Sequence, residues 1–99
     1  MKLKVPDKFV DILGTRYRIR YVRGLAANRS NLAETSFYYT TINIDPDMSI
    51  QLQFEAFVHE CVEVWNTKME WSLPHQVITQ LETCIVQLLV DNIKRMVCD

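Results

Sequence analysis

Glycine and proline are scarce in this chain of 99 residues, which contains two glycines and three prolines. With 48% hydrophobic and 23% charged residues, the composition excludes a collagen-like repeat, a low-complexity linker and a disordered tail. Long hydrophobic runs are also missing: the longest, residues 84–90, is interrupted by Gln87 and is far shorter than the roughly 20 residues that span a bilayer. No apolar segment follows the charged residues at 2–7, so we expect no secretory signal and a cytoplasmic protein without a membrane partner.

Cysteine occurs only three times, as Cys61, Cys84 and Cys98, and no pair has the C-x-x-C spacing of a zinc ribbon. The odd number argues against a disulfide framework, and two of the three lie in apolar surroundings with helical periodicity. We therefore expect buried, reduced thiols, which agrees with a reducing compartment.

The net charge is close to zero, at −1, and gives the chain no overall attraction to nucleic acid or membranes. The charge is unevenly distributed: residues 1–48 hold eight basic and five acidic residues, whereas residues 49–99 hold three and seven. Arg16, Arg18 and Arg20 share one face of a predicted strand. We interpret this face as solvated rather than as a phosphate or RNA contact, because no aromatic residues accompany the arginines there.

The first half of the chain has the periodicity of β-strands. Residues 16–22 alternate between apolar side chains and arginine, which predicts a half-buried strand. Gly14-Thr15 before it suits a two-residue hairpin turn with glycine first. After a loop at 25–30, β-branched residues predict a second hairpin. The predicted strands cover about residues 9–13, 16–22, 31–37 and 40–44.

From Ser49 onward the periodicity is helical, with Asp47 or Ser49 as the candidate N-cap. Residues 72–74 separate two helices, because Pro74 is tolerated in a first turn but not inside a helix. We predict a single domain over residues 1–99 of the α+β class: a small, mostly antiparallel sheet of about four strands followed by two packed helices. The strands fall within about residues 8–44 and the helices at about 49–70 and 73–97.

The first predicted helix carries the motif H-E-x-x-E at residues 59–63. His59 and Glu63 are four residues apart and so lie about 40° from each other on one helix face. The zincin helix H-E-x-x-H has this arrangement: two residues bind zinc, and the glutamate between them is the general base for a metal-activated water. Glu60 is the candidate base here. A polar helix face without further role is the simpler interpretation, but the apolar neighbours favour partial burial, where ionisable groups require partners.

A zinc hydrolase generally supplies three protein ligands and leaves one position open for water. His75, at the start of the second helix, is the candidate third ligand beside His59 and Glu63. An antiparallel helix pair places His75 near the end of the first helix, so a suitable crossing angle is needed to bring it toward Glu63. Glu82, two turns beyond His75, is the competing third ligand and gives a more acidic, less selective site.

In these features the chain resembles the small zincin-like metallopeptidases encoded by phages and prophages, distant relatives of the ImmA/IrrE-type and SprT-type peptidases. Common members have H-E-x-x-H in the helix and a glutamate ligand in the next helix. Here Glu63 stands where the second histidine would be, and His75 where that glutamate would be, so two positions exchange ligand type. The resemblance covers most of the chain and is carried by residues 12–14, 17–22, 42–45, 58–60 and 87–92.

We therefore expect a zinc-dependent metallopeptidase in which His59, Glu63 and His75 bind the metal and Glu60 takes the proton of water. The strand that ends at Ile44 is the expected edge for an extended peptide or protein substrate. One alternative is a non-catalytic metal-binding phage accessory protein that acts through a host protein. The other, weaker alternative is a nucleic-acid-associated module that uses the arginine strand.

Overall fold

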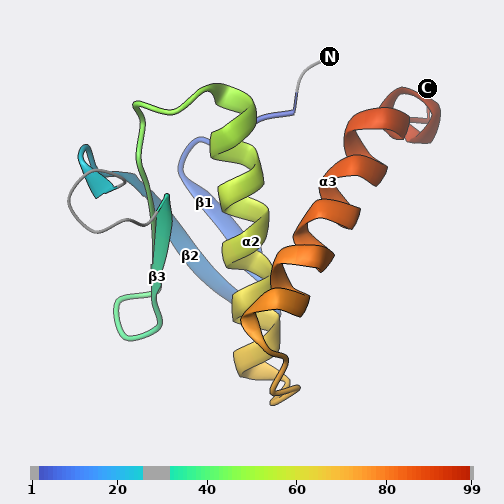
Figure 1. The fold of residues 1–99 in the computed structure, drawn as a ribbon. Helices are drawn as coiled ribbons and strands as arrows, with labels where there is room; N and C mark the ends of the chain where they lie inside the picture. Colours follow the sequence, from blue (N-terminus) through green and yellow to red (C-terminus); the bar gives the residue numbers. More distant parts are fainter. Residues whose placement is uncertain (1–2, 26–31, 99) are drawn as a thin grey trace.

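The computed structural model describes residues 3–25 and 32–98, and Figure 1 shows their arrangement. Four strands are followed by two helices, so the predicted α+β class is confirmed. The predicted strand start at Asn31 and most of the predicted loop at 25–30 lie outside the described residues. The elements are β1 (Phe9–Ile12), β2 (Thr15–Tyr21), β3 (Ala33–Ser36), β4 (Thr41–Ile44), α2 (Ile50–Lys68) and α3 (His75–Met96).

The strands form one mixed sheet in the order β1-β2-β4-β3. The pairs β1–β2 and β3–β4 are antiparallel, as predicted for two hairpins, whereas β2 and β4 pair in parallel. The prediction that the strand ending at Ile44 forms an edge is wrong. β4 lies inside the sheet, where Ile42 and Ile44 are fully buried, and β3 is the edge strand beside α2.

The β1–β2 turn consists of Leu13 and Gly14, one residue earlier than predicted. Ile12 pairs with Thr15, which leaves two residues in the turn. Both have positive φ angles, 50° and 82°, as a type I′ turn requires. This turn type fits the right-handed twist of the paired strands, so the strand pairing selects it over a turn that begins at the glycine.

The core lies between the inner face of the sheet and α2. Tyr17 and Ile19 of β2 are buried on this face, as their alternation predicts, while Tyr21 at the end of the strand is half exposed. Arg16, Arg18 and Arg20 are exposed on the other face of the strand, as the alternation predicts. The other large buried apolar residues are Val5, Ile12, Leu25, Ile42, Ile44, Phe54, Phe57, Val58, Val62, Val64, Ile78 and Val86.

The two helices lie close to their predicted bounds. Ser49 caps α2, since its hydroxyl accepts a hydrogen bond from the backbone N–H of Leu52 at 3.2 Å. α3 starts directly after Pro74 and packs mainly against α2, and its second half diverges from α2 (Figure 1). None of the described helices is long and apolar enough to cross a bilayer.

The three cysteines are free, so the structure has no disulfide bond among them. Their expected burial holds only for Cys61, which is half-buried on α2. Cys84 and Cys98 are exposed because the side of α3 that bears Cys84 faces away from α2, and Cys98 follows the end of that helix.

Candidate metal centre

The connection between the two helices brings the start of α3 back beside α2. Asn66, in the last turn of α2, holds this connection with its side-chain amide. Its oxygen accepts from the backbone N–H of Leu73 at 2.9 Å, and its nitrogen donates to the Leu73 carbonyl at 3.4 Å. Pro74 follows as the N-cap of α3, and His75, the first residue of the helix, lies two residues after this anchor, so its position is fixed relative to α2.

His59, Glu63 and His75, the His–Glu–His group, come together at this helix junction. One ligand atom from each lies within 4.8 Å of the other two. The Glu63 Oε1 atom is 3.7 Å from Nε2 of His59 and 3.9 Å from Nδ1 of His75. The ring centroids of the two histidines are 5.1 Å apart. The predicted ligand residues therefore converge, and the helix crossing supplies the contact between His75 and Glu63.

The spacing of the group suits a single small metal ion. A tetrahedral zinc ion with bonds of about 2.1 Å holds its ligand atoms about 3.4 Å apart. Modest rotations of the three side chains would bring their ligand atoms to this distance. Two imidazoles and one carboxylate are an established zinc ligand set. The group lies at the surface, since the His75 side chain is 77% exposed. A bound ion thus has an open side toward solvent.

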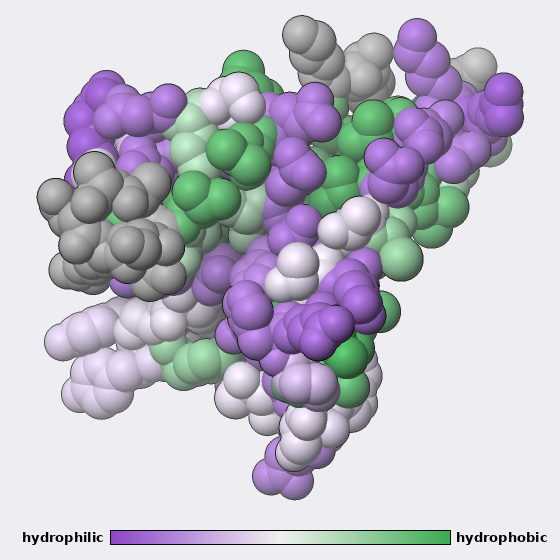
Figure 2. All heavy atoms as spheres, in the orientation of Figure 1, coloured by the Kyte–Doolittle hydropathy of each residue, from purple (hydrophilic) through white to green (hydrophobic). Residues whose placement is uncertain are grey.

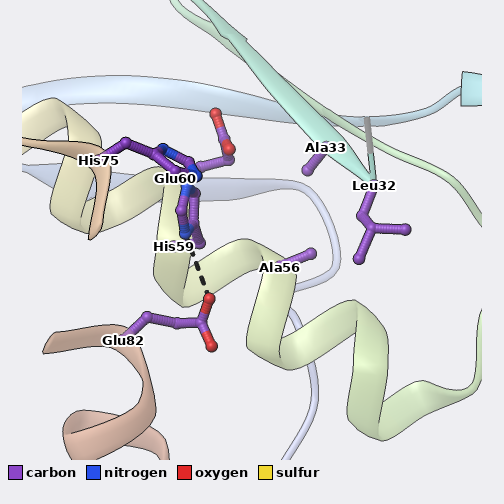
Figure 3. Close-up of a pocket in the computed structure, with 7 residues that line it drawn as sticks. All are labelled: Leu32, Ala33, Ala56, His59, Glu60, His75 and Glu82. Carbon is purple, nitrogen blue, oxygen red and sulfur yellow. Dashed lines mark hydrogen bonds and ion pairs between the residues drawn. The ribbon is translucent and has the colours of Figure 1, made fainter. Parts of the chain in front are cut away.

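Glu82 of α3 contacts the opposite nitrogen of His59. Its Oε1 atom lies 3.2 Å from Nδ1, whereas Glu63 faces Nε2. Figure 3 shows the Glu82 carboxylate on the α3 side of the histidine rings. Burial raises the pKa of Glu82, and the contact with His59 opposes this shift. In this structure Glu82 is a hydrogen-bond partner of His59 rather than part of the His–Glu–His group.

Glu60 lies on the sheet side of the histidine rings, opposite Glu82 (Figure 3). Only 9% of the residue is exposed, and the Thr35 hydroxyl on β3 donates to its Oε1 atom at 2.7 Å. Burial raises the pKa of the Glu60 carboxyl, while the hydrogen bond from Thr35 and the nearby His59 lower it. The predicted base is therefore next to the group and anchored to the edge strand.

A cavity of about 240 Å³ opens at the group. It is lined by Leu32, Ala33, Ala56, His59, Glu60, His75 and Glu82. The lining thus comes from the edge strand, from α2 and from α3, as the labelled side chains in Figure 3 show. In the space-filling view, hydrophilic side chains gather over the junction of α2 and α3 (Figure 2). The candidate base and both histidines therefore share one open pocket beside a sheet edge.

The thiol nearest to the group is a poor metal ligand. Cys61 lies between His59 and Glu63 in sequence but on another side of α2. Burial and the neighbouring Glu60 raise the pKa of its thiol to about 12, so it stays protonated at neutral pH. Metal binding needs the thiolate, and Cys61 is not part of the His–Glu–His group.

Three contacts of the site were not predictable from sequence spacing. Thr35 contacts Glu60 and Glu82 contacts His59, and in each pair the two residues lie on different elements. Neither Thr35 nor Glu82 belongs to a short motif. Asn66 contacts Leu73 in the helix connection, seven residues further along the chain. Its only sequence signal is an asparagine in the last turn of a helix before a Ser-Leu-Pro break.

The fold and the converging side chains define a candidate mononuclear metal site on an α+β scaffold. No protein-family model, curated protein or solved structure matches this chain. The chemistry of the site is therefore argued from its own residues.

Proposed function

We propose that this chain is a zinc-dependent hydrolase that cleaves peptide bonds, of the zincin-like kind that its sequence resembles. One observation carries the proposal: the ligand atoms of the His–Glu–His group lie within 4.8 Å of one another, and both histidines of the group line a pocket that Glu60 also lines. We place this activity in the cytoplasm, because three free cysteines suit a reducing compartment.

The His–Glu–His group, Glu60 and Thr35 have distinct roles in the proposed reaction. Zinc bound by the His–Glu–His group would supply Lewis-acid activation of a water molecule. Glu60 takes the proton from that water, and because burial raises the pKa of its carboxyl, Glu60 is a stronger base than an exposed glutamate. The hydrogen bond from Thr35 holds one Glu60 oxygen, which leaves the other oxygen to act on the water.

An extended peptide is the substrate class that fits the edge of the pocket. β3 pairs with β4 on one side, and no other described strand pairs with its free side. Ala33 of β3 lines the pocket beside Glu60. A peptide that adds to the free side of β3 as a further strand would have its backbone hydrogen-bonded alongside the site.

Metal content tests the ligand group directly. Untagged protein should contain about one zinc ion per chain, and His59→Ala and His75→Ala should each lose it because a site with two protein ligands binds zinc weakly. Gln76→Ala, a change at the exposed neighbour of His75, is the control and should retain the metal. Zinc that is absent from the native protein after zinc is added, or retained in both histidine variants, contradicts the proposed site.

Peptide cleavage tests the catalytic role of Glu60. Glu60→Gln should retain zinc and lose about 10²- to 10⁴-fold in turnover of a peptide library, because the amide cannot accept the proton. Cleavage at the native rate by zinc-loaded Glu60→Gln would contradict this mechanism.

A metal-binding protein without catalysis is the second candidate. The burial of Glu60 and its bond to Thr35 favour it, since both features also suit a purely structural carboxylate. In that case the same measurements give a different pattern. The native protein binds zinc and the histidine variants do not, but the native protein cleaves no peptide of the library. Such a protein would act by binding a protein partner.

A further inference from the structure

A partly buried carboxylate of α3 contacts the proposed metal site without belonging to its ligand group. Glu82 and His59 are mostly enclosed, with 16% and 18% of their side chains exposed. Glu82 lies two turns beyond His75 on the same helix. One face of α3 therefore supplies both a candidate ligand and a contact to another ligand.

The two nitrogens of His59 face different carboxylates. Nδ1 is 3.2 Å from Glu82, within hydrogen-bond distance, whereas Nε2 is 3.7 Å from Glu63, beyond it. A neutral imidazole carries its proton on one nitrogen, and a carboxylate can only accept a proton in a hydrogen bond. The shorter contact therefore favours the tautomer with hydrogen on Nδ1. The lone pair of Nε2 then points to the Glu63 carboxylate, and a cation placed between these two acceptors can bind both.

We propose that Glu82 is a positioning residue that fixes His59 in the Nδ1–H tautomer and so directs the Nε2 lone pair at a metal ion shared with Glu63 and His75. The inference rests on the proposed metal site. Histidine ligands of metals usually donate their second ring N–H to a carboxylate or carbonyl group in this way. The specific assignment here is that α3 supplies this carboxylate from the face that also holds His75.

The tautomer can be measured in the absence of metal. In ¹⁵N-labelled protein treated with a chelator, two-bond ¹H–¹⁵N spectra distinguish a protonated ring nitrogen from an unprotonated one. At pH 8.5 we expect His59 to carry its proton on Nδ1 alone. In Glu82→Ala we expect a substantial population of the Nε2–H form. Glu82→Gln should keep the native tautomer, because its amide oxygen still accepts from Nδ1.

Zinc affinity provides the second measurement. Glu82→Ala should weaken zinc binding by about 10- to 100-fold, the usual cost of losing such a partner. Glu82→Gln should lose less zinc affinity than Glu82→Ala. Asp91→Ala removes the same charge from an exposed position of α3 and should bind zinc as the native protein does. Circular dichroism checks that each variant is folded.

Several outcomes would overturn the inference. These are an Nε2–H tautomer in the native protein, protonation of both His59 nitrogens at pH 8.5, or an unchanged tautomer in Glu82→Ala. The first two need no variant, so a failure of Glu82→Ala to fold leaves the inference testable. If the native protein has the Nδ1–H tautomer but binds no zinc, the proposed metal site fails while the hydrogen bond from His59 to Glu82 stands.

Discussion

Tyr17 is the largest fully buried side chain, and its hydroxyl has no hydrogen-bond partner among the described residues. A buried hydroxyl without a partner costs free energy on folding. Tyr17→Phe should therefore unfold at an equal or higher urea concentration than the native protein, with a gain of up to about 1 kcal/mol at pH 7. A loss of more than about 1 kcal/mol would show that the hydroxyl makes a stabilising contact.

The same hydroxyl makes stability sensitive to alkaline pH. Burial raises the pKa of Tyr17 above its ordinary value of 10.0. The folded protein then holds the proton more tightly than the unfolded chain, so this contribution to stability is complete below pH 10 and is lost as the pH rises further. In urea unfolding between pH 9 and 11, Tyr17→Phe should lose less stability than the native protein. Tyr38→Phe, at an 87% exposed position, should behave like the native protein.

The hydrogen bond between Thr35 and Glu60 is the main polar contact between the edge strand and the site. Thr35→Val keeps the shape of the side chain but leaves the Glu60 carboxylate buried without its donor. We expect a loss of about 1 to 3 kcal/mol in the free energy of unfolding. Thr35→Ser retains the hydroxyl and should lose less. Equal stability of the two variants would mean that the hydrogen bond from the hydroxyl to Glu60 does not stabilise the fold.

At the scale of single residues, local spacing predicted the ligand group but not its supports. His59 and Glu63 are one helical turn apart, so their proximity follows from helix geometry alone. The contacts of Glu60 with Thr35 and of His59 with Glu82 join residues 25 and 23 positions apart. They depend on how β3 and α3 dock on α2, which no local pattern encodes.

At the scale of elements, a narrow row of buried apolar side chains holds α3 against α2. Ile78 and Val86 are its buried apolar residues, whereas Leu88 is 58% exposed. Ile78→Ala should therefore destabilise the protein by about 2 to 5 kcal/mol, as large-to-small changes in a core do. Leu88→Ala, with a comparable loss of side chain, should change stability by less than about 0.5 kcal/mol in the same urea titration.

A similar loss in both variants would show that Leu88 is covered in solution. Ile78 also lies between His75 and Glu82 on α3, so Ile78→Ala is expected to weaken zinc binding as well. Leu88→Ala should leave zinc affinity unchanged, since the second half of α3 diverges from α2 (Figure 1).

Element types were predictable because hydrophobic periodicity differs between strands and helices. The helices at Ile50–Lys68 and His75–Met96 lie within two residues of their predicted bounds. The order of the strands was not predictable in the same way. Consecutive strands β3 and β4 pair as a hairpin, but only the long-range parallel pairing of β2 with β4 places β4 inside the sheet and β3 at the edge. This pairing decides which strand borders the pocket.

At the scale of the whole molecule, the proposed metal adds a link between α3 and the rest of the fold, which otherwise meet mainly where α3 packs on α2. α2 packs on the sheet, whereas α3 packs mainly on α2. The His–Glu–His group takes two ligands from α2 and one from α3, so a bound ion would connect α3 to the rest of the fold. Because the folded chain alone assembles these ligands, zinc binding should stabilise the folded state.

Zinc at about 100 times its dissociation constant should therefore add about 2.7 kcal/mol to the free energy of unfolding. This gain should disappear in His75→Ala. The metal-free stability of that variant should be close to the native value, because the His75 side chain is 77% exposed and its removal leaves the core intact. Urea unfolding of both proteins, with a chelator and with added zinc, separates the two effects. A zinc-dependent gain that persists in His75→Ala would mean that the ion binds elsewhere. The packing of Ile78 and Val86 alone would then hold α3 in position.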